Sequence, residues 1–181
     1  MNKRWTIILG TLIFSVVSDQ YTKILAIEHL KAKAPSIYWN DLFRLTYAEN
    51  SGAFLGLGSN LPIMARTAIF SVAVSVFLIA FAVFVFKKKE MSTVGNVASA
   101  LVIGGGIGNL IDRIANGGYV VDFMNMGINH IIAFIPRTGI FNVADIWIMV
   151  GAALLLFAPD FKNKKKKNDS SDESKADDVP T

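Results

Sequence analysis

Residues 104–145 open with GGGIGNLIDR (104–113), pass through VDF (121–123) and close with FNVAD (141–145). The acidic residues of this stretch stand at the edges of strongly apolar runs. A charged side chain inside hydrocarbon is costly, so an acid at the edge of a membrane span is by default a candidate functional group. We therefore expect two helix ends to meet here, at the outer side of a membrane.

The composition excludes an ordinary soluble domain. Hydrophobic residues make up 52% of the 181-residue chain and the mean hydropathy is +0.45. The net charge is +4, but most Lys and Arg residues lie beside apolar runs, where the positive-inside rule places them. A nucleic-acid partner is therefore not expected. The chain has no cysteine, which excludes a disulfide, a thiolate metal site and a cysteine nucleophile.

Four apolar runs are long enough to cross a bilayer at ~20 residues per span. We expect the spans at about residues 5–27, 62–86, 94–111 and 141–158. The first run is interpreted as a retained helix and not as a cleaved signal peptide, because it is long, contains Asp19 and Gln20, and lacks an Ala-x-Ala-like site after a short apolar core. The expected fold class is a membrane all-α protein with four transmembrane helices and a short amphipathic surface helix.

The two outer connections carry different patterns. Residues 28–61 form the β-rich connection, in which the alternation over 42–47 predicts a strand. In the second connection, apolar residues at helical spacing predict the amphipathic surface helix; they are Met124, Ile128, Ile131, Ile132 and Ile135. Residues 1–161 are expected to form one four-helix membrane domain. Residues 162–181 have no apolar periodicity and are expected to be a disordered, charged cytoplasmic tail.

The distribution of basic residues predicts the topology. Eleven Lys and Arg residues fall on the two termini and the second-to-third connection, whereas six fall on the two opposite connections with their flanking turns. Both termini are therefore expected in the cytoplasm.

The polar residues of the spans share one depth. Asp19 lies roughly 20 Å beyond Trp5 at ~1.5 Å per residue, in the outer third of the membrane. Asn109 and Asp112 end the third span, and Asn142 and Asp145 begin the fourth. A transporter would be expected to place coupling residues near the midplane. This band favours a site that opens outward and sideways.

Asp122 lies far enough beyond the third span to turn back toward Asp145. Two carboxylates held close tend to share one proton, so that one can activate water while the other polarises a peptide carbonyl. This is the acid–base logic of aspartic proteolysis. The alternative is a pair of capping acids at helix amino termini, which are favourable without any chemistry. Spacing alone leaves both interpretations open.

Five motifs, taken in order, resemble those of the lipoprotein signal peptidase (signal peptidase II) family. They are Asp19-Gln20-x-x-Lys23, Asn50-x-Gly52-Ala53, Gly104-Gly105-x-x-Gly108-Asn109-x-x-Asp112-Arg113, Val121-Asp122-Phe123 and Phe141-Asn142-x-Ala144-Asp145. The resemblance implies a bacterial inner-membrane aspartic endopeptidase with four transmembrane helices and a small extracytoplasmic β-cradle. It would remove the signal peptide from a diacylglyceryl-modified prolipoprotein immediately before the lipidated cysteine.

The resemblance also assigns roles to residues. Asp122 and Asp145 match the catalytic pair. Substrate-binding positions are matched by Asn50, Gly52, Asn109, Arg113, Asn142 and Ala144. Structural support is expected from Asp19, Lys23, Gly105, Gly108 and Asp112. From the residues alone, Asn109 and Asn142 could equally be interhelical hydrogen-bond partners, and Asp112 could merely orient Arg113.

No metal and no cofactor are expected. The expected partners are diacylated prolipoproteins, membrane lipid and, by family resemblance, globomycin-type inhibitors, and a monomer is expected because a laterally open groove needs free lipid access. Two non-proteolytic functions remain as alternatives: a small proton or ion carrier using Asp19, Lys23 and Asp145, and a non-catalytic lipoprotein-binding membrane protein.

Overall fold

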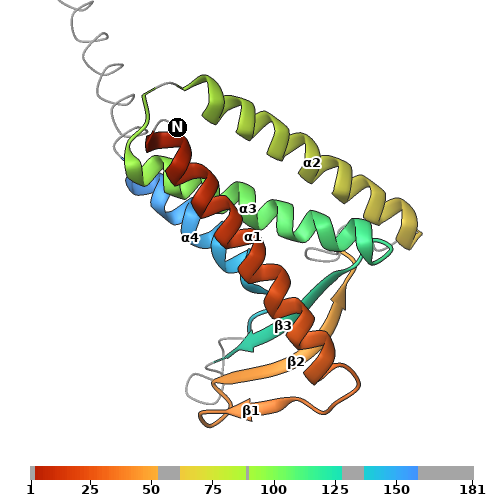
Figure 1. Ribbon diagram of the computed structural model, residues 1–181. Coiled ribbons are helices and arrows are strands. Elements are labelled where there is room, and N and C mark those ends of the chain that lie inside the picture. Colours follow the sequence, from red (N-terminus) through yellow and green to blue (C-terminus); the bar gives the residue numbers. More distant parts are fainter. Residues whose placement is uncertain (1–2, 53–61, 89, 128–136, 159–181) are drawn as a thin grey trace, which may run out of the picture.

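The computed structural model describes residues 3–52, 62–88, 90–127 and 137–158. Four helices and three strands follow one another along the chain (Figure 1). In chain order they are α1 (Lys3–Leu30), β1 (Ser36–Tyr38), β2 (Phe43–Asn50), α2 (Ile63–Lys87), α3 (Thr93–Ala115), β3 (Val120–Met126) and α4 (Val143–Phe157). The predicted tail at 162–181 lies outside the described residues.

Helix α3 occupies the centre of the bundle and contacts all three other helices. Its glycines allow this close approach. A Cβ on Gly104 would collide with Ser15 of α1, and a Cβ on Gly105 would lie 2.8 Å from Ile148 of α4. Small residues at such positions are a common packing device between membrane helices.

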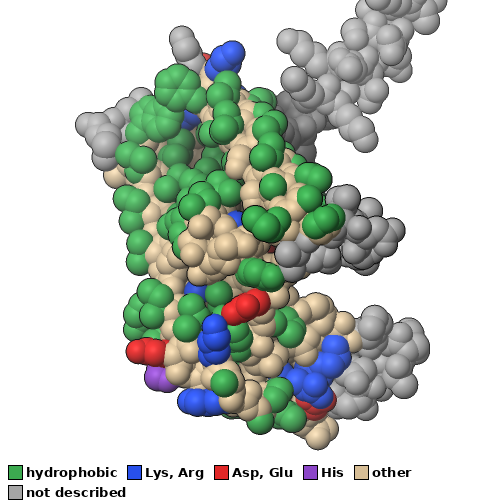
Figure 2. All heavy atoms as spheres, turned by 90° about the vertical axis from the view of Figure 1, so that its right-hand side faces the viewer, with side chains coloured by type: hydrophobic (Ala, Val, Ile, Leu, Met, Phe, Trp, Pro, Cys, Tyr) green, Lys and Arg blue, Asp and Glu red, His purple; other side chains and the backbone are tan. Residues whose placement is uncertain are grey.

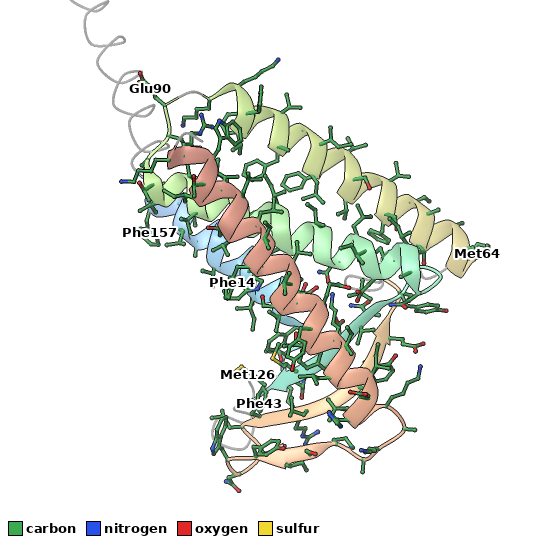
Figure 3. All side chains as sticks on the ribbon, viewed as in Figure 1. Phe14, Phe43, Met64, Glu90, Met126 and Phe157 are labelled. Carbon is green, nitrogen blue, oxygen red and sulfur yellow. The ribbon has the colours of Figure 1, made fainter. Side chains whose placement is uncertain are left out.

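Two helical stretches, Thr67–Lys87 and Thr93–Ala115, are long and apolar enough to cross a membrane, and α4 is a shorter apolar helix. In Figure 2, hydrophobic side chains cover most of the helical part, whereas most charged side chains on that face lie over the sheet. In Figure 3, Glu90 and Phe157 lie at one end of the bundle and Met64 lies at the other.

The sheet is antiparallel with strand order β1-β2-β3, and it lies at the bundle end opposite the amino terminus (Figure 1). The predicted strand at 42–47 is confirmed as the first part of β2. A register shift between Leu45 and Ala48 separates two paired segments of β2 and β3. Strand β3 is held on α1 by a hydrophobic cluster of Ala26, Val121 and Phe123.

The prediction of an amphipathic surface helix is wrong for Met124, the first of its five apolar residues. Met124 lies in β3, where it pairs with Leu45 and, through an isolated bridge, with Phe141. The apolar spacing that suggested a helix mixes a strand residue with later ones, since Ile128, Ile131, Ile132 and Ile135 lie outside the described residues. Two helices are also longer than expected: α1 continues to Leu30 and α3 to Ala115.

Candidate functional site

The amino terminus of α4 positions Asp145. Asn142 caps this helix: its side-chain oxygen accepts a hydrogen bond from the Asp145 backbone N–H at 3.0 Å, and Asp145 Oδ2 accepts one from the Asn142 backbone N–H at 3.1 Å. This reciprocal pair is a capping box. It holds the Asp145 carboxylate at the positive end of the helix, a position that suits a negative charge.

Asp122 reaches the same asparagine from β3. Asn142 Nδ2 donates to Asp122 Oδ1 at 2.7 Å, and Asn50 Nδ2 at the end of β2 donates to Asp122 Oδ2 at 2.9 Å. The backbone N–H of Gly52 in turn donates to Asn50 Oδ1 at 2.9 Å, which fixes the direction of the Asn50 amide. Asn142 therefore contacts both acids of the predicted pair: its side chain donates to the Asp122 carboxylate and its backbone N–H donates to the Asp145 carboxylate.

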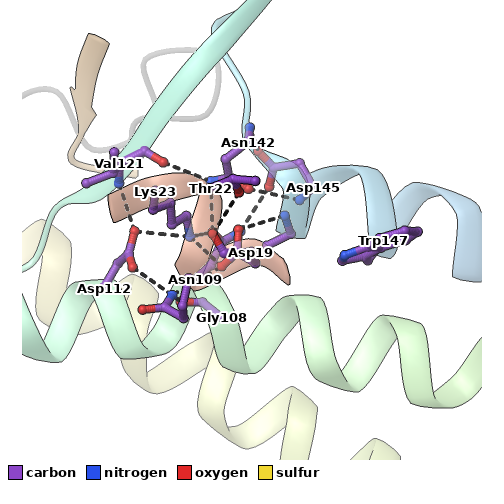
Figure 4. Close-up of polar contacts among 12 residues, drawn as sticks. Asp19, Thr22, Lys23, Gly108, Asn109, Asp112, Val121, Asn142, Asp145 and Trp147 are labelled. Carbon is purple, nitrogen blue, oxygen red and sulfur yellow. Dashed lines mark hydrogen bonds and ion pairs between the residues drawn. The ribbon is translucent and has the colours of Figure 1, made fainter. Parts of the chain in front are cut away.

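Asn109 of α3 is the second connecting residue (Figure 4). Its Oδ1 accepts hydrogen bonds from Lys23 Nζ and from Asn142 Nδ2, both at 3.0 Å, and its Nδ2 donates to Asp145 Oδ1 at 2.9 Å. Because Lys23 has donors only, it determines which end of the Asn109 amide faces it. The amide nitrogen is thereby directed at Asp145.

Lys23 lies between two buried acids of neighbouring helices. Its Nζ is 2.8 Å from Asp19 Oδ2 and 3.1 Å from Asp112 Oδ2, and the three side chains are 3%, 0% and 4% exposed. Each acid also accepts a hydrogen bond from the backbone N–H of the residue directly before one of the candidate catalytic acids. Asp19 binds the N–H of Ala144 and Asp112 binds that of Val121, both at 2.9 Å.

Gln20 is a site residue that sequence reasoning did not select. Its Nε2 lies 3.0 Å from Asp112 Oδ1, 3.2 Å from Asp19 Oδ2 and 3.1 Å from the Gly108 carbonyl oxygen. The available signal was its place inside a polar group on an otherwise apolar helix.

The other predicted positions surround this network. Arg113 Nη1 donates to the Asn109 carbonyl oxygen at 3.3 Å, and among the described residues its buried Nε has no hydrogen-bond partner. Among those residues, no hydrogen bond joins Asp112 to Arg113, because Asp112 binds Lys23, Gln20 and Val121 instead. Ala144 is fully buried.

The two predicted glycines are tightly packed against the site. A Cβ on Gly108 would collide with the Asp19 carboxylate and contact Ala144, and a Cβ on Gly105 would meet the Ala144 carbonyl oxygen at 2.5 Å. Glycine at these positions lets α3 approach both α1 and α4. The site geometry therefore depends on the absence of a side chain at both.

Burial raises the pKa of Asp122 to about 6, and the neighbouring charge of Asp145 adds to this effect, while hydrogen bonds from Asn50 and Asn142 oppose it. The side chain is only 2% exposed. A carboxyl group that keeps its proton to near-neutral pH can act as an acid beside a second carboxylate. The pair is therefore suited to acid–base chemistry.

One cavity lies outside this site. An apolar cavity lies between the end of α1 and the sheet, lined by Leu45 and Phe123. Because successive strand residues point to opposite faces, this cavity is on the other side of β3 from Asp122. Within the described ranges, no three His, Asp or Glu side chains gather as a metal ion would need.

Comparisons with known proteins agree on one family. Residues 11–159 match the family model described as signal peptidase (SPase) II. A lipoprotein signal peptidase of Chlorobium phaeobacteroides is 36% identical over 155 residues, covering 84% of this chain and 88% of the relative. One of Borreliella burgdorferi is 31% identical, covering 92% and 97%. A solved structure described as a bacterial membrane enzyme superposes with a TM-score of 0.68 at 28% identity, covering 83% of this chain and 90% of that one.

Proposed function

The chain belongs to the signal peptidase (SPase) II family, and from that premise we propose that it is an aspartic endopeptidase with Asp122 and Asp145 as its catalytic pair. Its family role is the cleavage of signal peptides from prolipoproteins. We propose further that the substrate is diacylglyceryl-modified and that cleavage falls immediately before the lipidated cysteine.

The observation that carries the aspartic mechanism is the position of Asn142 between the two acids. Its Nδ2 donates to Asp122 at 2.7 Å, and its backbone and side chain close the capping box with Asp145. A pair of acids that served only as helix caps would not need a shared partner. Asp122 belongs to β3 and caps no helix.

The environments of the two acids support a division of roles between them. Asp145 accepts hydrogen bonds from Asn109 and from the Asn142 backbone at the head of a helix, so it acts as the base. It takes a proton from water, and the oxygen of that water attacks the carbonyl carbon of the scissile peptide bond. Asp122, protonated below about pH 6, gives its proton to the carbonyl oxygen. In the breakdown of the tetrahedral intermediate the C–N bond breaks: Asp145 gives its proton to the leaving nitrogen, and Asp122 takes back a proton from a hydroxyl of the intermediate as the new carboxyl group forms.

The predicted substrate-binding residues form two groups, which differ in how far they are buried. Arg113 has an unused buried donor beside the pair, and an arginine can hold several peptide carbonyl oxygens. Asn50 is the exposed last residue of β2, and Gly52, two residues further on, is half-buried. These three residues would contact the substrate. Asn109, Asn142 and Ala144 are buried, so they would shape the site from behind the carboxylates.

A further part of the proposal concerns how the helices are arranged in the membrane. We propose that α1, α2, α3 and α4 all span the bacterial inner membrane as one monomeric domain with both termini in the cytoplasm. This is supported by the two apolar spans and by the eleven-to-six distribution of basic residues. The pair then lies near the outer leaflet, where lipid and globomycin-type inhibitors would reach it from the side.

The test uses the purified full-length chain in lipid nanodiscs with a prolipoprotein precursor in lipidated and unlipidated forms. Asp122→Asn and Asp145→Asn should each remain folded and lose cleavage, whereas Glu28→Gln, a change at an exposed acid outside the site, should cleave as the parent does. Normal processing by either Asp variant would end the aspartic proposal. Proton flux without cleavage by the parent would favour a carrier instead, and binding without turnover a lipoprotein-binding protein.

A further inference from the structure

The hairpin that joins β1 to β2 exposes large apolar side chains. Trp39 is 74% exposed, and Ile37 and Tyr38 just before it are 59% and 43% exposed. The Trp39 ring lies 6.4 Å from that of Tyr38 and 5.9 Å from that of Phe43. An aromatic cluster of this size in water is unfavourable, so a surface of this kind marks an interaction site.

The backbone of this hairpin is held in a rare conformation. Trp39, Asn40 and Asp41 have φ values of +50°, +50° and +68°. Residues other than glycine adopt this left-handed region as single exceptions, and such strain persists only where the surroundings impose it. Three in succession therefore need strong support.

That support comes from two arginines. Arg44 binds the Asp41 carboxylate through Nε and Nη2, and Arg137 Nη1 donates to the Asp41 carbonyl oxygen at 2.6 Å. Arg137 Nε also donates to Asn125 Oδ1 of β3 at 2.7 Å, which ties the hairpin to the sheet. The exposed indole is thus presented on a braced loop.

We propose that the β1–β2 hairpin is an interfacial anchor, which seats Trp39 among the phospholipid headgroups of the outer leaflet. Ile37 and Tyr38 are adjacent in a strand, so their side chains point to opposite faces, and both are exposed. A flat protein partner would cover one face only. A lipid interface surrounds the hairpin and covers both, and tryptophan and tyrosine are enriched at that level.

The outer edge of strand β1 limits how deeply the hairpin can enter the membrane. Among the described strands, β1 pairs only with β2, so within that part of the chain its outer backbone groups have no strand partner. Such groups are satisfied by water and headgroups but not by hydrocarbon. Figure 1 shows the strands running across the helix axes at the end of the bundle, a level compatible with the headgroups. This inference rests on the proposed membrane orientation of the helices.

The chain has three tryptophans, which permits a direct test in nanodiscs. The variant with Trp5→Phe and Trp147→Phe keeps Trp39 alone, and the matched variant with Trp5→Phe and Trp39→Phe keeps Trp147, which packs on Phe14 within the bundle. Each is measured with phospholipids brominated near the ester linkage or near the chain end, and with iodide in the water.

We expect Trp39 emission to be blue-shifted, quenched more by the shallow bromines than by the deep ones, and weakly quenched by iodide, whereas Trp147 prefers the deep bromines. Water-like emission and full iodide quenching of Trp39, with Trp147 still quenched by lipid, would overturn the anchor and leave the membrane proposal intact. Protection of Trp39 from all three quenchers would mean a protein partner and would also overturn it. Failure of lipid to quench Trp147 would overturn the spanning proposal, and the anchor with it.

A second experiment tests the anchor without replacing any tryptophan. Because the chain has no cysteine, Asn40→Cys provides one labelling site at the hairpin tip with all three tryptophans in place. An environment-sensitive fluorophore there should be blue-shifted in nanodiscs and quenched by spin-labelled headgroups. Emission as in water would contradict the anchor.

Discussion

Replacing Lys23 by methionine should lower the free energy of unfolding more than any other single substitution in the polar network. The substitution keeps most of the side-chain volume but leaves Asp19 and Asp112 without their shared cation. Both acids are nearly inaccessible to water. Breaking a buried ion pair by removing one partner is strongly destabilising, because the remaining charge is uncompensated.

The contact distances set the magnitude. At an effective dielectric constant of about 20, each of the two contacts contributes on the order of 5 kcal/mol of attraction, which the cost of desolvation largely offsets. Removing one partner of such a pair costs about 3–5 kcal/mol. For a chain of this size that corresponds to a fall in unfolding temperature of roughly 6–20 °C.

The control is the neutral triple variant Asp19→Asn, Lys23→Met and Asp112→Asn. It should recover most of the lost stability, because these three positions no longer hold a buried charge and the Asn oxygens can still accept from the backbone N–H groups of Ala144 and Val121. Its cleavage activity should stay low, because Asn109 has lost the donor that directs its amide toward Asp145. Thermal unfolding in detergent and cleavage of lipidated precursor give the two readouts.

Two results would refute this reasoning. If Lys23→Met unfolds at the temperature of the parent, the buried acids do not depend on the lysine. If the triple variant cleaves at the parental rate, Lys23 does not orient Asn109.

Three further predictions concern the same network. Burial holds the pKa of Asp122 near 6, so its proton is bound below that pH and lost above it; kcat/KM for cleavage should therefore fall as the pH rises through about 6, and a flat profile there would contradict its role as the acid. Gly108→Ala should cost about 1–3 kcal/mol of stability because the new Cβ meets the Asp19 carboxylate, whereas Gly10→Ala, where nothing lies within 4 Å, should be neutral or stabilising in the same unfolding assay. Trp147→Phe should cost about 1 kcal/mol through loss of the indole hydrogen bond to α1, and an unchanged unfolding temperature would show that bond to be dispensable.

Sequence patterns identified the family and much of the architecture. The family resemblance based on five short motifs is confirmed by the match over residues 11–159. The strand at 42–47 was predictable because period-two alternation is a local signal. Helical spacing placed Asn109 and Asp112 on one face of a span, and both lie in the buried part of α3.

The connections within the site were not predictable in the same way. Spacing suggested that Asp122 turns back toward Asp145, but only the fold reveals that Asn142 binds both. Gln20 was missed because its three partners come from α1 and α3. Met124 was assigned to a helix because its spacing to later isoleucines imitates a helical face, while its real neighbours are Leu45 and Phe141.

Asn142 has a consequence for how the protein matures. The residue that caps α4 also contacts both acids, so the last helix must form and dock before the proposed catalytic pair is assembled. A chain still emerging from the insertion machinery carries the acidic residues but not their arrangement. In the proposed enzyme, the order of folding itself thereby delays cutting until the chain is assembled.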